Sequence, residues 1–161
     1  MTKASDHHVR FSLESVTSCN VPKAMFTAHY EELAPLKAAL KLDPDWDQYR
    51  KWQAAGELVL VIARNQDNEV VGYAAMVIRP HPHYRGVKIA VDDLHYLAPA
   101  YRSLGVGKEM IKFAEAAAFN MGARVMTMRC KAGHNHGHIF ESMGYSLCDL
   151  VYLKDLTHEV A

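Results

Sequence analysis

The sequence predicts an α/β fold in which a mixed, mostly antiparallel sheet of about six strands is flanked by about four helices. Short apolar runs and segments of period two alternate along the chain with longer segments of period 3.6. Residues typical of turns, such as Gly86 and Gly144, separate them. A chain of 161 residues can bury one continuous core. We therefore expect a single domain over residues 1–161, with residues 1–8 frayed.

The first half of the chain predicts a strand, two helices and a hairpin. Val9 to Val16 alternates apolar and polar side chains, as a half-buried strand does. Pro22 is tolerated in the first turn of the next helix, and Gly56 closes the second. Two apolar strands then flank a polar turn. The expected elements are a strand at 9–16, helices at 21–33 and 43–56, and strands at 58–63 and 70–78.

The second half predicts alternating strands and helices. Prolines and Gly86 precede a strand, and apolar side chains at i, i+3, i+4 and i+7 between Gly105 and Met121 predict an amphipathic helix. Gly144 ends a further short helix. The expected elements are strands at 87–97 and 124–130, helices at 105–121 and 136–143, and a last strand at 147–156.

Composition excludes several classes of protein. Lysine plus arginine and aspartate plus glutamate number 18 each, so net charge gives no support for binding nucleic acid or an anionic membrane. The three cysteines include no CxxC pair, which favours reduced thiols over a disulfide framework. No signal peptide and no apolar run long enough to cross a membrane is present. We therefore expect a cytoplasmic protein.

The most informative segment runs from Tyr96 to Lys108, between a predicted strand and a predicted helix. The first backbone N–H groups of a helix have no intrahelical partner, and the helix dipole favours negative charge there. Gly105 and Gly107 let a pyrophosphate approach these groups, and Arg102 adds a charge-assisted contact. The alternative is a tight turn without a ligand, since a G-x-G spacing alone is a weak signal.

Three strings resemble the GCN5-related N-acetyltransferase (GNAT) family. Pro99-Ala-Tyr-Arg-Ser-Leu-Gly-Val-Gly107 resembles its R/Q-x-x-G-x-G/A motif, Gly72-Tyr73 its Gly-aromatic strand, and Phe140-Glu-Ser-Met-Gly-Tyr145 its closing helix-to-strand signature. The order of elements from about Val9 to Leu156 is also similar. Residues 79–84 and 136–138 look like acetyltransferase-like proteins of bacteriophages.

The resemblance implies an acetyl-coenzyme-A-dependent N-acetyltransferase that acts on a primary amine of a small molecule or protein. In the family the sheet opens at the end of the fourth strand, and the pantetheine arm lies in the gap. The implied coenzyme contacts in this chain are His95, Tyr96, Leu97, Arg102, Ser103, Leu104, Gly105, Val106, Gly107, Lys108, Asn135 and Phe140. Dimers are common among relatives, so a homodimer is a further expectation.

Attack on a thioester requires a neutral amine and therefore a base. The resemblance implies that this base is Asp93. Asp93 lies on the strand leading to the loop and could act through a water. Alternation along a strand sends Asp92 and Asp93 to opposite faces, so at most one can reach the cleft. The alternative is that both carboxylates are solvated or pair with Lys88 or Arg85.

The family's usual acid, a tyrosine, aligns with Phe140, which has no proton to donate. Three interpretations remain: the thiolate leaves unassisted, His136 or Tyr145 replaces the tyrosine, or the site is degenerate. The last would make the chain a coenzyme-A-binding or phage interaction protein.

The histidines at 134, 136 and 138 lack a cysteine or carboxylate at ligand spacing, so no metal is expected. Acidic residues gather in the first two expected helices and the loop between them, which hints at a cationic acceptor such as a polyamine, an aminoglycoside or lysine. They are Glu31, Glu32, Asp43, Asp45 and Asp47.

Overall fold

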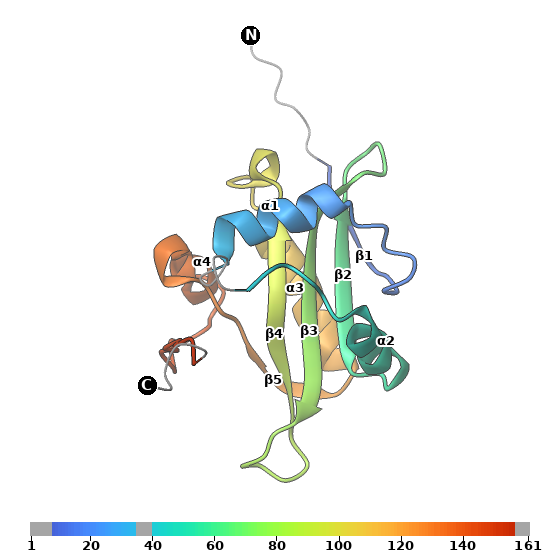
Figure 1. The fold of residues 1–161 in the computed structure, drawn as a ribbon. Coiled ribbons are helices and arrows are strands. Elements are labelled where there is room, and N and C mark those ends of the chain that lie inside the picture. Colours follow the sequence, from blue (N-terminus) through green and yellow to red (C-terminus); the bar gives the residue numbers. More distant parts are fainter. Residues whose placement is uncertain (1–7, 35–39, 157–161) are drawn as a thin grey trace.

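The computed structural model describes residues 8–34 and 40–156. Its core is one five-stranded sheet in the order β1-β2-β3-β4-β5 (Figure 1). The strands are β1 (Arg10–Leu13), β2 (Leu58–Arg64), β3 (Val70–Pro80), β4 (Lys88–Leu97) and β5 (Ala123–Thr127). The first four pair antiparallel, and β4 and β5 pair parallel. The predicted mixed α/β sheet is thus confirmed.

Helices cover both faces of this sheet. α1 (Lys23–Leu33) crosses one face and α3 (Val106–Asn120) the other, while α2 (Trp46–Ala54) lies beside β2 (Figure 1). α4 (Gly137–Glu141) follows the chain that leaves β5. Two 3-10 turns, η1 (Pro99–Tyr101) and η2 (Ala132–His134), precede α3 and α4.

Alternation along the strands builds two separate cores. On the α3 side, Val59, Val61 and Ala63 of β2 pack with Ala114 and other small residues of α3. On the α1 side, Ile62 packs with Tyr73, Tyr96 and the half-buried Phe26 of α1. Small side chains on α3 let that helix lie close to the sheet, whereas aromatic rings fill the α1 side.

The expectation of a sixth strand at residues 147–156 is wrong. The structure describes this segment as irregular chain, and its apolar side chains are exposed, up to 89 % for Tyr152. A strand requires a hydrogen-bonded neighbour as well as local propensity, and none of the described segments pairs with residues 147–156. The first strand is also shorter than expected, ending at Leu13. The predicted fraying of residues 1–8 concerns residues that, apart from His8, lie outside the described ones.

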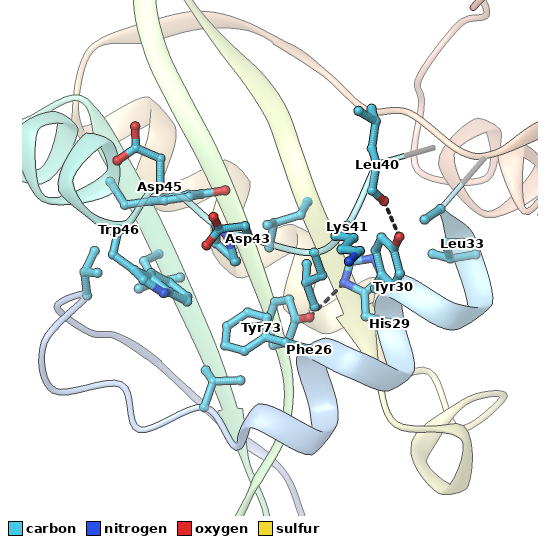
Figure 2. Close-up of a pocket in the computed structure, with 18 of the residues that line it drawn as sticks. Phe26, His29, Tyr30, Leu33, Leu40, Lys41, Asp43, Asp45, Trp46 and Tyr73 are labelled. Atoms are coloured by element: carbon cyan, nitrogen blue, oxygen red, sulfur yellow. Dashed lines mark hydrogen bonds between the residues drawn. The ribbon is translucent and has the colours of Figure 1, made fainter. Parts of the chain in front are cut away.

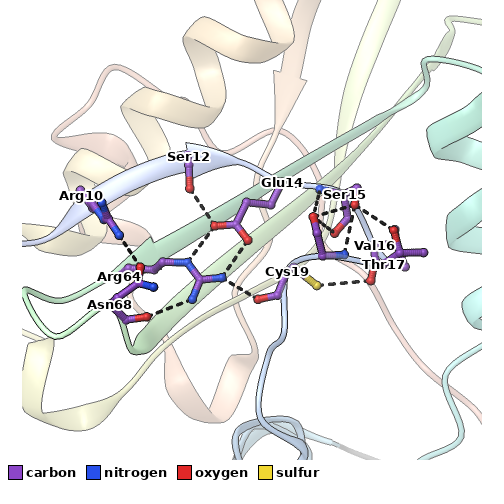
Figure 3. Close-up of polar contacts among 10 residues, drawn as sticks. Arg10, Ser12, Glu14, Ser15, Val16, Thr17, Cys19, Arg64 and Asn68 are labelled. Carbon is purple, nitrogen blue, oxygen red and sulfur yellow. Dashed lines mark hydrogen bonds and ion pairs between the residues drawn. The ribbon is translucent and has the colours of Figure 1, made fainter.

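A polar cluster joins the chain after β1 to the end of β2 (Figure 3). Arg64 donates from Nε and Nη2 to the two carboxylate oxygens of Glu14, each at 2.8 Å, and from Nη2 to the Cys19 carbonyl at 2.8 Å. The Arg64 hydrogen bond is the main cause of a lowered pKa at Glu14. This ion pair orients the segment that leads into α1, and hence one wall of the pocket described below.

Candidate functional site

A β-bulge in β4 decides which of its side chains share a face. Ala75 of β3 faces Leu94, but the next residue, Met76, faces Asp92, so Asp93 is an extra residue without a partner on β3. Directly opposed residues point to the same side of a sheet. Asp92 and His95, opposite Met76 and Ala74, therefore lie on the α3 side despite their spacing of three.

The neighbouring residues of β4 face the other way. Leu94 and Tyr96 pack with Tyr73 on the α1 side. Asp93 is exposed and accepts a hydrogen bond from the hydroxyl of Tyr49 on α2. Burial, assisted by Asp93, raises the pKa of Tyr49, so this hydroxyl keeps its proton. The two adjacent carboxylates thus point to opposite faces, as strand alternation predicts.

β5 pairs with the first part of β4 only, because β5 ends while β4 continues. The last paired residues are Val91 and Thr127, and beyond them the chain after β5 leads away from β4 toward α4 (Figure 1). Among the described residues no strand pairs with this side of β4 from Asp92 to Leu97. We call this gap the strand opening.

The buried Asp92 carboxylate lies at the start of the strand opening. The side chain of Asp92 is only 3 % exposed. Its Oδ2 accepts the backbone N–H of Arg129 at 3.2 Å, and its backbone carbonyl accepts from the Arg129 guanidinium. The Asp92 carboxylate thus accepts a backbone N–H from the segment that follows β5. This hydrogen bond stabilises the separation of that segment from β4.

Two histidines bridge the strand opening. His95 Nδ1 lies 3.1 and 3.2 Å from the carboxylate oxygens of Asp92, and His95 Nε2 lies 3.1 Å from His136 Nε2. His136, the N-cap of α4, directs its Nδ1 to the His134 carbonyl at 2.9 Å. Phe140 packs against both imidazoles, with ring centroids 6.0 and 5.2 Å away. Burial is the main cause of a lowered pKa at His136.

At its far end the strand opening meets the N-terminus of α3. Gly105 is the N-cap and has φ +80°, a left-handed conformation that glycine adopts without strain. No side chain of the described residues caps this helix. The N–H groups of Val106, Gly107 and Lys108 are therefore open to an anion. The preceding Ser103 is also left-handed, at φ 65°, so the loop turns tightly here.

Arg102 is already engaged by the protein. Its Nη1 and Nη2 lie 2.8 and 2.9 Å from the two carboxylate oxygens of Glu32 on α1, and its Nε donates to the Leu97 carbonyl at 2.8 Å. The guanidinium also lies over the ring of Tyr96, 5.3 Å from its centroid. The side chain remains 38 % exposed, so one face of the guanidinium is accessible at the loop.

Close packing fixes the end of β4 against β3. A Cβ on Gly72 would lie 2.8 Å from both the Tyr96 carbonyl oxygen and Cδ1 of Leu97. Only glycine allows this approach. Asn135 lies between η2 and α4, where its side-chain oxygen accepts the Gly137 N–H at 2.9 Å.

A pocket of about 600 Å³ lies on the α1 side of the sheet (Figure 2). We call it the aromatic pocket. Phe26 contacts Trp46 and Tyr73, with ring centroids 5.3 and 5.1 Å away. His29 shares a hydrogen bond of 2.8 Å with the Tyr73 hydroxyl. Burial lowers the pKa of His29 to about 4, so this ring is neutral at physiological pH. The pocket reaches β4 at Leu94, next to Asp93.

Charged groups occur at the edge of the aromatic pocket. Asp43 and Asp45 belong to the segment between α1 and α2, and Lys41 and Lys131 also line it. Leucines and aromatic rings form most of the remaining wall.

The structure brings together some predicted site residues and separates others. Asp93 contacts Tyr49 of α2, which lines the aromatic pocket, whereas His136 and Phe140 lie at α4. Tyr145 donates its hydroxyl to Glu115 of α3 at 2.7 Å, and its ring packs against Phe140, with ring centroids 5.9 Å apart. Across residues 8–34 and 40–156, no three histidine, cysteine or carboxylate side chains gather as metal ligands. Sequence patterns give no signal for His29 or Arg129, because only the folded sheet places them here.

No helix in the described part of the chain is long and apolar enough to span a bilayer. Asp92, His95 and His136 form a site between β4, the N-cap of α4 and the segment after β5.

Solved structures share this fold at low identity. Glucosamine-6-phosphate N-acetyltransferase from Arabidopsis thaliana is 12 % identical, with a TM-score of 0.65 over 92 % of this chain and 99 % of that one. A transcriptional regulator from Bacillus halodurans C-125 is 16 % identical, with a TM-score of 0.73 over 92 % and 100 %. AAC(6')-Iy in complex with the bisubstrate analogue CoA-S-monomethyl-acetylneamine is 18 % identical, with a TM-score of 0.64 over 92 % and 97 %.

Curated proteins give no sequence match to this chain. The comparisons also give the bacteriophage subgroup no support. The model of the Acetyltransferase (GNAT) family, however, matches residues 26–145, which include the strand opening, the loop before α3 and both histidines of the pair. The chain belongs to the GNAT acetyltransferase family.

Proposed function

We propose that this chain transfers the acetyl group of acetyl-coenzyme A to a primary amine with an apolar body. The observation that supports the proposal most is the strand opening, which begins beyond Val91 and ends at the uncapped first turn of α3. Acetyl-coenzyme A, as a thioester, supplies the acetyl group and a sulfur leaving group. GNAT proteins use this donor, and a neighbouring structure holds a coenzyme A analogue.

The residues at the strand opening fit the two chemical parts of the donor. The first-turn N–H groups of α3 and the accessible face of Arg102 suit the pyrophosphate, since both present positive charge to an anion. The unpaired side of β4, from Asp92 to Leu97, offers backbone groups to the amides of a pantetheine arm. Further proposed contacts are Ser103 and Leu104 of the loop, Asn135 between η2 and α4, and Phe140 of α4.

The aromatic pocket suits the body of the acceptor. Rings and leucines line most of it, so a polyamine or an aminoglycoside would lose hydration there without regaining hydrogen bonds. An aryl or alkyl body would instead be removed from water along these walls. Asp43 and Asp45 at the edge can attract the ammonium group as the amine enters.

Asp93 is the proposed base. It is the bulge residue of β4, and its neighbour Leu94 and its contact Tyr49 both line the aromatic pocket. Its carboxylate is exposed, so a water can carry a proton from the amine to it. The Tyr49 hydroxyl donates to the carboxylate and holds it in place.

The test is acetyl transfer by the purified protein to four amines: 2-phenylethylamine, octylamine, spermidine and kanamycin. Mass spectrometry would identify the products, and thiol release would give the rates. We expect kcat/KM for the first two amines to exceed that for the last two by about tenfold or more, the effect of burying several methylene groups. Preference for spermidine or kanamycin would contradict the apolar acceptor, and transfer to none of the amines would contradict the proposed function.

A further inference from the structure

The hydrogen-bond chain Asp92–His95–His136 fixes where its protons lie. A carboxylate and a backbone carbonyl can only accept hydrogen bonds. His95 Nδ1, facing Asp92, and His136 Nδ1, facing the His134 carbonyl, must therefore both carry hydrogen. If both imidazoles were neutral, each Nε2 would present a lone pair to the other.

One more proton would satisfy the contact between the rings. The two Nε2 atoms are 3.1 Å apart, a hydrogen-bonding distance that two lone pairs would oppose. One shared proton makes the pair an imidazole–imidazolium unit with a single positive charge. The carboxylate of Asp92, whose side chain is 3 % exposed, balances that charge and offsets the burial of the pair.

We propose that the shared Nε2 proton of His95 and His136 is the general acid of acetyl transfer, with Asp92 as the residue that positions and retains it. This inference rests on the proposed function. The pair occupies the strand opening and packs against Phe140, at the position where the sequence lacks a proton donor. Tyr145 is not available for this role, because its hydroxyl donates to Glu115.

The proton balance of the step is complete. The neutral amine nitrogen forms a bond to the acetyl carbonyl carbon, and the bond from that carbon to sulfur breaks. Sulfur leaves with the electron pair and takes the Nε2 proton, which gives the free thiol. The new amide nitrogen loses its extra proton to water beside Asp93, and the pair regains one proton from solvent. A thiol has an ordinary pKa of about 8.5 and an imidazole about 6.5, so this proton transfer is downhill.

Burial is the main cause that lowers the pKa of His136 and so favours release of a shared proton, whereas the charge of Asp92 raises this pKa and favours its retention. Titratable and charged groups from every neighbouring element bear on it. They are Asp92 on β4, Arg129 and Lys131 after β5, His134 and His138 beside α4, Tyr145 after α4 with Glu115 on α3, and His29 on α1.

The kinetic test compares wild type with His136→Ala, His95→Ala and the double variant, using an amine that wild type accepts. We expect each single variant to lower kcat at neutral pH by about 10²-fold, the usual contribution of a general acid. The double variant should lose little more, because the rings act as a unit. The affinity for acetyl-coenzyme A should change less than about threefold, and the alkaline limb of the kcat profile should disappear.

Two further variants separate chemistry from structure. Phe140→Tyr added to His136→Ala should restore kcat at least about tenfold, because it supplies a hydroxyl donor at the position where the family resemblance implies the acid. Asp92→Asn should move the alkaline limb to lower pH, since the pair loses its counter-charge. Three outcomes would each contradict the assignment of the pair as general acid. They are an unchanged kcat in His136→Ala, additive losses in the double variant, and no rescue by Phe140→Tyr.

A proton count tests the pair without any turnover. In the protein labelled with ¹⁵N-histidine, NMR titration should show His95 and His136 taking up their first extra proton together. Replacement of either histidine should then shift the titration curve of the other. Titration of each histidine independently of the other would contradict the claim that they share a proton. Absence of transfer by wild type with every amine would instead contradict the proposed function.

Discussion

Arg102 pairs with Glu32 through two parallel hydrogen bonds of 2.8 and 2.9 Å, and thereby ties the loop before α3 to α1. The same guanidinium belongs to the loop that is proposed to hold the pyrophosphate. Glu32 and the pyrophosphate therefore compete for it.

Glu32→Gln should strengthen binding of acetyl-coenzyme A by about two- to fivefold, because it removes a competing negative charge while keeping the shape of the side chain. Isothermal titration at low and high salt would measure this, and the gain should shrink at high salt. Arg102→Gln should weaken binding in either background. Weaker binding by Glu32→Gln would contradict this competition, because it would show that the ion pair positions the loop for the ligand.

Asp93→Asn should lower kcat/KM by about 10²-fold and abolish the acid limb of its pH profile, because the asparagine amide cannot accept the amine proton. Tyr49→Phe is the matched variant. It removes one donor to the carboxylate, so the acid limb should persist but move to higher pH. An Asp93→Asn enzyme with an unchanged rate and acid limb would remove Asp93 from the mechanism.

Glu14→Gln should lower the free energy of unfolding at pH 7 by about 1–3 kcal/mol, since it weakens a charged, half-buried hydrogen-bonded pair with Arg64. The pKa of Glu14 is lower in the folded protein than its ordinary 4.5. Its contribution is therefore complete above pH 4.5 and is lost as the pH falls through the folded-state pKa. Measured by urea unfolding from pH 7 to pH 3, the free energies of unfolding of wild type and Glu14→Gln should converge. A difference that stays constant over this range would contradict the ion pair.

Gly72→Ala should destabilise the protein by about 1–3 kcal/mol, because the new methyl group would overlap the Tyr96 carbonyl oxygen and Leu97. Gly133→Ala is the control: nothing lies within 4 Å of its Cβ position. Chemical denaturation should show a change of no more than about 0.5 kcal/mol for the control. Equal stability of the two variants would contradict the close approach of β3 and β4.

Most of the fold follows from local patterns in the sequence. The apolar period of α3 and the turn residues around β2 and β3 predict these elements within a few positions of where they lie. Residues 147–156 show the limit of such patterns. They have the composition of a strand, but a strand forms only where a neighbouring strand can pair with it. Among the described residues, no sixth strand pairs with β5.

The candidate site shows a different limit. Sequence motifs point to the loop before α3 and to His136, because glycine spacing and a missing tyrosine can be read directly. The relation between Asp92 and His95 cannot be read, since residues three apart in a regular strand face opposite ways. Only the bulge at Asp93 puts them on one face. Likewise, His95 and His136 are 41 positions apart and meet only across the strand opening.

The central claim is that acetyl-coenzyme A binds at the strand opening with its pyrophosphate on the first turn of α3. The most direct test is isothermal titration of acetyl-coenzyme A against wild type, Gly105→Glu and Gly86→Glu. Gly105 and Gly86 have φ near +80°, and neither has an atom within 4 Å of its Cβ position, so the two variants introduce similar backbone strain and the same charge. We predict that wild type and Gly86→Glu bind, and that Gly105→Glu loses at least about 100-fold in affinity, because its carboxylate occupies the anion position. Failure of wild type to bind, or equal affinity of Gly105→Glu and Gly86→Glu, would contradict the claim.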